Sequence, residues 1–197
     1  MLRFVSMVAS HWLGFVILIH VGLFILQMHV LLPIEDLLLG HLSLYASVLF
    51  LPHASRVLAA WLLGPKALFA LVPAEVFFTY ALVSEPIFGV SILTTILAPA
   101  IAAASPVIAF EAMRIAGVDV YPSTSRKPNW RAVIFAGCVA SVINSISGTL
   151  IKTYALPSNS IFEIIARYFI GDTVGLFIVM LVLMFVLRRL ERKGSIA

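Results

Sequence analysis

The chain has 197 residues, of which 62% are hydrophobic and 11% charged, with a formal net charge of +4. Its mean hydropathy is +1.11, whereas soluble domains contain about 45–50% apolar and about 25% charged residues. This composition excludes a soluble globular protein and indicates an integral membrane protein. The cations lie near the ends of apolar runs and in one loop, which argues against a nucleic-acid partner. The single cysteine, Cys138, excludes an intramolecular disulfide.

The apolar runs predict helices that cross a membrane. A hydrocarbon core about 30 Å thick needs roughly 20 helical residues per crossing, so the chain has room for about six crossings. Only helices and closed barrels satisfy backbone polar groups in lipid, and the runs show no strand alternation. We therefore expect an all-α, polytopic membrane protein with a single domain, residues 1–197. The predicted spans are about 10–32, 38–62, 66–83, 89–116, 130–154 and 161–189.

The first apolar run is longer than a signal-peptide core and has no convincing cleavage site, so we expect it to remain as the first span. Loop charge then predicts that both termini are cytoplasmic. The cations of the predicted inner segments are Arg3, Lys66, Arg114, Arg126, Lys127, Arg131, Arg188, Arg189, Arg192 and Lys193. The predicted outer loops carry Glu35, Asp36, Glu85, Lys152 and Glu163. No kinase, cyclase or nucleotide-binding module is expected after the last span.

Charged side chains inside the predicted spans need a reason, because each costs several kcal/mol unless it is paired or hydrated. Arg56 and Glu75 are expected to pair with each other, the alternative being a protonated Glu75. Glu111 and Arg114 are three residues apart on one helix face, which favours a local ion pair. Arg167 and Asp172 bring the number of such residues to five, Arg114 being counted only as the partner of Glu111.

Pro52 lies inside the second predicted span and is followed by His53, Ser55 and Arg56. Proline removes a helical hydrogen bond, so the helix should kink or break here, and the freed carbonyls must face protein or water. Two interpretations remain open. Broken membrane helices often line binding cavities, whereas a plain kink would only bring these polar residues against a neighbouring helix.

Other polar residues give weaker signals. His11, His20 and His29 recur every nine residues, which places His20 on the opposite helix face from the other two, so this helix alone offers no metal site. The fifth span carries small and polar residues that favour close helix packing, and Asn144 could also contact a ligand. No nucleophile with an adjacent base and no phosphate-binding loop is present in the sequence, so we expect neither an enzyme nor a bound cofactor or metal.

Asp172 begins the last and most apolar run, in YFIGDTVG. We expect it about a turn and a half into the sixth helix, near the outer face, where a carboxylate favours the helix dipole. Gly171 and Gly175 would let another helix approach closely. The break at Pro52 could supply His53 or Arg56 as a partner across the bundle.

Two segments resemble the membrane-associated sensor domain family, type one, which precedes histidine kinases and diguanylate cyclases in bacteria. The segment LFLPHASRVLAAWLLGPK is similar to that family's W-P-P-x-G motif and the glycine-closed helix that follows it. The segment ARYFIGDTVG is similar to its W-x-x-G-D-x-x-G signature. The matching positions are Pro52, Gly64, Tyr168, Gly171, Asp172 and Gly175. His53 and Ser55 stand where the family has its second proline and its glycine.

The resemblance implies a sensory module of the bacterial inner membrane, multi-pass and non-enzymatic, that couples a small ligand or membrane state to a separate protein partner. Its candidate polar cavity comprises His53, Arg56, Glu75, Asn144 and Asp172. Two alternatives stay open: a small-solute-binding transport component that needs an energising partner, and a structural or assembly subunit of a larger membrane complex. Membrane lipid and a protein partner are the expected interactions.

Overall fold

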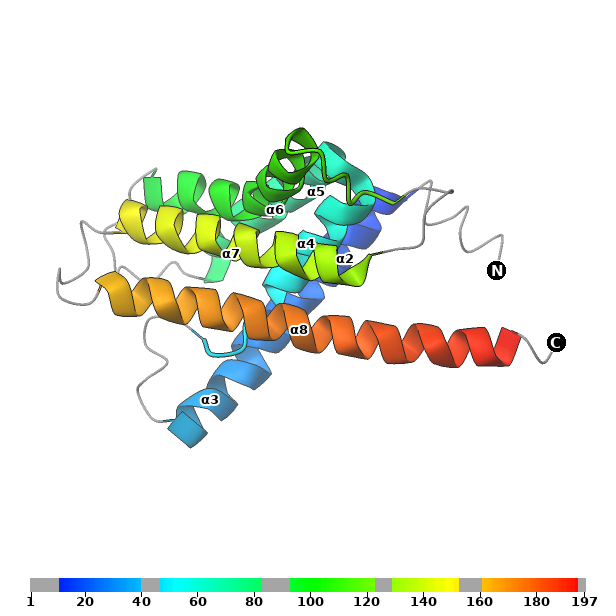
Figure 1. Ribbon diagram of the computed structural model, residues 1–197. Coiled ribbons are helices and arrows are strands. Elements are labelled where there is room, and N and C mark those ends of the chain that lie inside the picture. The colour runs from blue at the N-terminus through cyan, green and yellow to red at the C-terminus, as the bar shows by residue number, and fades with distance from the viewer. Residues whose placement is uncertain (1–10, 40–46, 83–92, 123–128, 153–160, 195–197) are drawn as a thin grey trace.

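The computed structural model describes residues 11–39, 47–82, 93–122, 129–152 and 161–194. Every secondary-structure element in these ranges is a helix, which confirms the all-α class (Figure 1). Five of the helical stretches are long and apolar enough to cross a membrane: Trp12–Leu38, Pro52–Ala81, Thr95–Ile115, Trp130–Ile151 and Ile161–Val186. The chain is therefore compatible with a multi-pass membrane protein.

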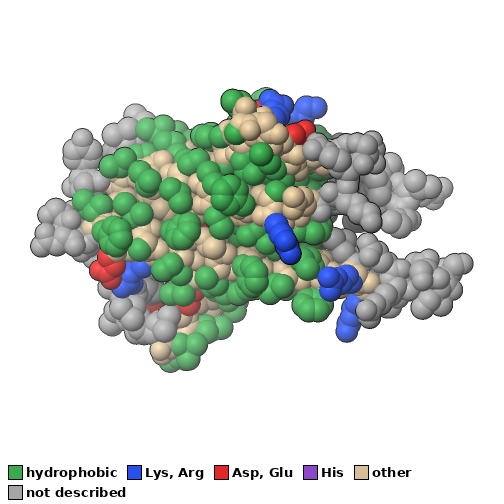
Figure 2. Space-filling view, in the orientation of Figure 1, with side chains coloured by type: hydrophobic (Ala, Val, Ile, Leu, Met, Phe, Trp, Pro, Cys, Tyr) green, Lys and Arg blue, Asp and Glu red, His purple; other side chains and the backbone are tan. Residues whose placement is uncertain are grey.

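The surface has the distribution of side chains that a bilayer requires. Hydrophobic side chains cover most of the face shown in Figure 2, and the charged side chains lie toward its two ends. Large apolar residues such as Leu18, Phe77 and Phe185 are 66–68% exposed. Exposure of this kind over long helices indicates contact with lipid rather than water.

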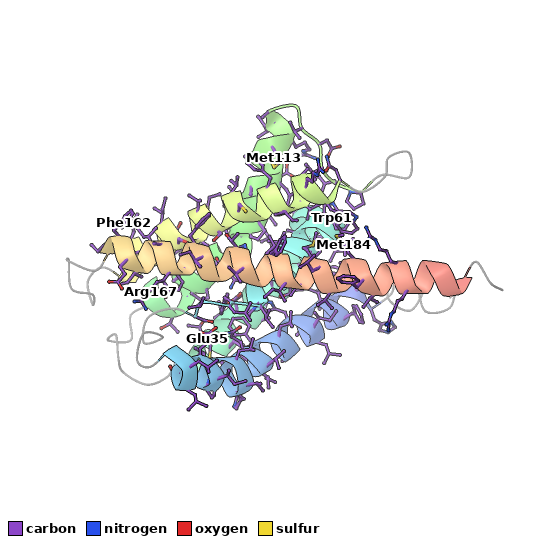
Figure 3. All side chains as sticks on the ribbon, turned by 60° about the horizontal axis from the view of Figure 1, so that its bottom comes forward. Glu35, Trp61, Met113, Phe162, Arg167 and Met184 are labelled. Carbon is purple, nitrogen blue, oxygen red and sulfur yellow. The ribbon has the colours of Figure 1, made fainter. Side chains whose placement is uncertain are left out.

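The first helical stretch extends beyond its predicted end at residue 32. It consists of α2 (Trp12–Leu26), a π-helical turn η1 (Gln27–Leu31) and α3 (Leu32–Leu39). Glu35, expected in an outer loop, lies within α3 and is only 9% exposed (Figure 3). A π-helical turn inside an α-helix often marks a functional position, and this turn begins at the buried Gln27.

The helix of the second predicted span, 38–62, is interrupted at Pro52, as the proline indicated. Residues 47–51 are not helical, and α4 (Pro52–Leu63) begins at Pro52. Proline suits this position, because its fixed φ fits the first helical turn and it has no N–H to leave unsatisfied. With 12 residues, α4 is about 18 Å long, too short to cross a core about 30 Å thick.

The chain reverses direction after α4. Gly64 has φ +59°, a conformation that favours glycine, and Pro65 follows it. The short η3 (Gly64–Ala67) then leads into α5 (Leu68–Leu82). Arg56 and Glu75 are in contact, although a straight helix would separate them by about 28 Å. The apolar stretch from Pro52 to Ala81 is therefore a helical hairpin.

The second half of the chain follows the predicted helices closely. It contains η5 (Leu93–Leu97), α6 (Ala98–Ile115), α7 (Trp130–Lys152) and α8 (Ile161–Gly194). Helices α7 and α8 lie side by side with opposite directions, and α8 continues well beyond the other helices (Figure 1). The short α4 lies at the centre, in contact with α2, α6, α7 and α8.

Residues 47–51, which we call the entry segment, lie directly on α8. The Phe50 N–H donates to the Gly171 carbonyl at 3.0 Å. A Cβ added to Gly171 would lie 2.1 Å from the Ser47 carbonyl oxygen, and one added to Gly175 would lie 2.3 Å from that of Phe50. Two glycines were expected to admit a neighbouring helix; they admit a non-helical backbone instead.

We predict that Gly175→Ala destabilises the protein by roughly 1–3 kcal/mol, because the added methyl group cannot be accommodated without moving the backbone of the entry segment. Gly148→Ala is the matched control, since Gly148 lies in a helix and a Cβ there meets nothing within 4 Å. Thermal unfolding in detergent measures both. Equal midpoints for the two variants would contradict the close approach.

Candidate functional site

Polar side chains of α4 occupy the centre of the bundle and reach two different neighbours. His53 is fully buried, Ser55 is 7% exposed and Arg56 is 2% exposed. Side chains from α2 and α5 surround Arg56 and Ser55, whereas side chains from α7 and α8 surround His53. Because they share one short helix, the two groups form one connected polar core.

The first group joins α2, α4 and α5. Arg56 Nε lies 2.8 Å from Glu75 Oε1, which confirms the expected pair. His20 Nε2 lies 3.1 Å from the same oxygen, and His20 Nδ1 lies 2.6 Å from Ser55 Oγ. Arg56 also donates to the Ala102 carbonyl of α6 at 3.4 Å, and its guanidinium carbon lies 5.3 Å from the centre of the Phe50 ring.

The second group joins α4, α7 and α8 around Asp172. Asn144 Nδ2 donates to Asp172 Oδ2 at 2.9 Å, and Ser141 Oγ lies 3.3 Å from the same oxygen. His53 Nδ1 is 3.5 Å from it. Asp172 lies about three turns after Ile161, where α8 begins, and is 1% exposed. Its expected place, about a turn and a half into the helix, is therefore wrong: it lies about three turns in, buried in the bundle.

The entry segment is anchored by polar side chains of the first helical stretch. Gln27 accepts the Leu51 N–H at 3.1 Å and donates to Ser47 Oγ at 2.9 Å. Glu35 accepts the N–H groups of Val48 and Leu49 at 3.2 and 3.0 Å. A non-helical backbone in a bilayer must have such partners, because no water replaces them.

Several members of this polar core were not singled out in the sequence. Gln27 is the only glutamine of the chain and interrupts an apolar run, which is a usable signal. His20 was correctly placed on the opposite face from His11 and His29: it is buried, and they are exposed. Its partners could not be inferred, because they lie on helices whose orientation the sequence does not specify. Ser55 was noted after Pro52, and Ser141 belongs to the small and polar residues of the fifth span, but neither was proposed as a site residue.

The remaining charged residues pair locally. Glu111 forms the expected ion pair with Arg114 and also accepts a hydrogen bond of 2.8 Å from the Tyr121 hydroxyl. Burial, together with this hydrogen bond, raises the pKa of Tyr121 above its ordinary value. Arg167 pairs with Glu163 on the first turns of α8 (Figure 3).

The residues matched by the family resemblance have different surroundings. Pro52 begins α4 and Gly64 ends it. Gly171 and Gly175 contact the entry segment, and Tyr168 is partly exposed on α8. Of the candidate cavity residues, all five belong to the polar core, where their polar atoms face one another.

Side chains of this core that already contact one another could exchange protons and hydrogen-bond partners. Within the described ranges, no three His, Cys, Asp or Glu side chains are grouped so that they could hold a metal ion.

No protein-family model matches the chain, and no curated protein or solved structure matches it either. The likeness to a sensor family therefore stays a prediction.

We predict that Glu75→Gln destabilises the protein by about 3–5 kcal/mol, because it leaves the buried Arg56 without its counter-charge. Glu163→Gln removes the same charge from a pair whose carboxylate is 61% exposed, and should cost no more than about 1 kcal/mol. Unfolding of the two variants in detergent can be compared directly. A similar loss in both would show that the buried pair is not important for stability.

Proposed function

We propose that this chain is a non-enzymatic, sensor-like subunit of the bacterial inner membrane, which couples a small ligand or the state of the membrane to a separate protein partner. In this proposal the polar core around α4 receives the signal, and α8 passes it on. The sensory role is similar to that of the membrane-associated sensor domain family, type one.

The observation that carries the proposal is the continuity of α8. This helix runs unbroken from Ile161 to Gly194, and Asp172, buried within it, contacts side chains from α4 and α7. The exposed Arg188 lies about 24 Å further along the same helix. A change in the contacts of Asp172 would shift or rotate a rigid rod, so its basic end would move with it.

The motif positions of the resemblance support the same proposal. Gly171 and Gly175 contact the entry segment, and Asp172 between them contacts His53, the residue after Pro52. The two segments that carry the resemblance thus meet at one place, although 99 residues lie between them in the sequence. Such a contact would let a change at α4 reach α8 directly.

We propose a topology of six traverses with both termini cytoplasmic. The entry segment and α4 together would make the second traverse, and α5 the third. Exposed cations lie toward the helix ends at the proposed inner side. They are Lys66 in η3, Arg114 near the end of α6, Arg131 at the start of α7, and Arg188 and Arg189 toward the end of α8. The predicted loop charges Arg3, Glu85, Arg126 and Lys127 lie outside the described residues.

Gentle extraction of the tagged chain, followed by mass spectrometry of the proteins that co-purify with it, tests the proposal. We expect a kinase, a cyclase or another signalling protein. Recovery of an ATPase pair would replace the proposal with a transport component, and a stoichiometric large complex would replace it with an assembly subunit.

Asp172→Asn tests whether α8 carries the coupling. We expect the variant to fold and still bind the partner but to lose the response of the partner's activity to the stimulus. Glu163→Gln, which removes a surface charge from the same helix, should respond normally. A normal response in the Asp172→Asn variant would show that Asp172 is only a packing residue.

A further inference from the structure

The hydrogen bonds of His53 determine which of its nitrogens carries a proton. His53 Nε2 lies 3.1 Å from the Gly137 carbonyl oxygen. A carbonyl can only accept, so Nε2 must hold a proton and donate it. In a neutral imidazole the other nitrogen is then a bare acceptor. That nitrogen, Nδ1, faces Asp172 Oδ2 at 3.5 Å.

An ionised Asp172 would meet this nitrogen lone pair to lone pair. Both groups are buried, His53 with 0% and Asp172 with 1% of its surface exposed. One additional proton removes the conflict: it converts His53 to an imidazolium facing a carboxylate, or Asp172 to a carboxylic acid that donates to Nδ1. Both arrangements place a single proton between the same two atoms.

His20 meets Glu75 in a similar geometry. Ser55 has a single hydroxyl proton and donates it to the Pro52 carbonyl at 2.7 Å, so its oxygen accepts from His20 Nδ1 at 2.6 Å. In a neutral ring, His20 Nε2 would then face Glu75 Oε1 without a proton, at 3.1 Å. The two carboxylates differ in their other partners, because Glu75 Oε1 also faces the cation of Arg56 at 2.8 Å.

The charges around His53 and Asp172 also favour an additional proton between them. Arg56, on α4 with His53, is already balanced by Glu75 of α5. The other groups on Asp172 are the neutral Asn144 and Ser141 of α7. The other charged groups that act on His53 are Arg56 of its own helix and Glu75 of α5. A carboxylate in a bilayer without a cation is costly, and one proton makes the group neutral.

We propose that the contact between His53 Nδ1 and Asp172 Oδ2 is a proton-binding site that links α4 to α8. The bound proton joins the two helices at acidic pH, and its release as the pH rises leaves Asp172 held only by the neutral donors of α7. This site goes beyond the proposed signalling role and depends on no partner. It makes the proton itself a ligand of the chain.

The test observes the proton directly in the purified protein. Replacement of His11, His29 and His41 by Gln leaves His20 and His53, whose ring nitrogens are followed by ¹⁵N NMR in lipid nanodiscs from about pH 5 to about pH 8. Infrared spectroscopy of the same sample detects a protonated Asp172 carboxyl. We expect the acidic sample to show either an imidazolium at His53 or a carboxylic acid at Asp172.

Asp172→Asn should remove both signals, whereas Glu163→Gln, with its charge removed from the surface of α8, should keep them. The proposal is wrong if the protein with only these three histidines replaced shows a neutral His53 and no carboxylic acid band at every pH, a result that does not require the Asp172 variant to fold. A protein that holds the proton yet shows no signalling partner would overturn the proposed function and leave this site standing.

Discussion

The whole arrangement depends on one constraint: a stretch of backbone that is not helical lies inside a membrane bundle. The N–H groups of the entry segment have no water to bond, so distant groups must accept them. Gln27, Glu35 and the carbonyl of Gly171 do so. The first helical stretch and α8 are thereby tied to a five-residue segment, which fixes where α4 begins.

A short central helix has an unusual consequence for charge. Because α4 begins in the interior, its first turn places His53 and Arg56 among apolar helices rather than at an interface. Each then needs its own partner, from α8 and α5 respectively. The polar core thus balances its charges through contacts between helices, so the packing of helices and the protonation of side chains are one equilibrium.

Hydropathy was sufficient to predict most of the helices, because a bilayer demands long apolar stretches whatever their packing. It did not show that residues 47–51 are not helical, because composition cannot distinguish a buried helix from another buried segment, and only Pro52 indicated a break. The difference lies in side chains far away, at Gln27 and Glu35, which supply the hydrogen bonds that a helix would have made internally.

The candidate site could be predicted in part for a similar reason. A buried charge needs an opposite charge, so Arg56 and Glu75 could be paired from the sequence alone. Neutral partners such as Ser55 follow no such rule. Their roles depend on which way each helix faces, and only the packed structure supplies that.

The contact between the entry segment and α8 constrains the amino acids on its two sides unequally. On α8, Gly171 and Gly175 face carbonyl oxygens at distances that no side chain can share. On the other side, those oxygens belong to the main chain, which every amino acid has. The side chain of Val48, which is 45% exposed, is therefore free to drift over evolutionary time, whereas the two glycines are not. Among related chains, we therefore expect position 48 to vary and the two glycines of α8 to stay the same.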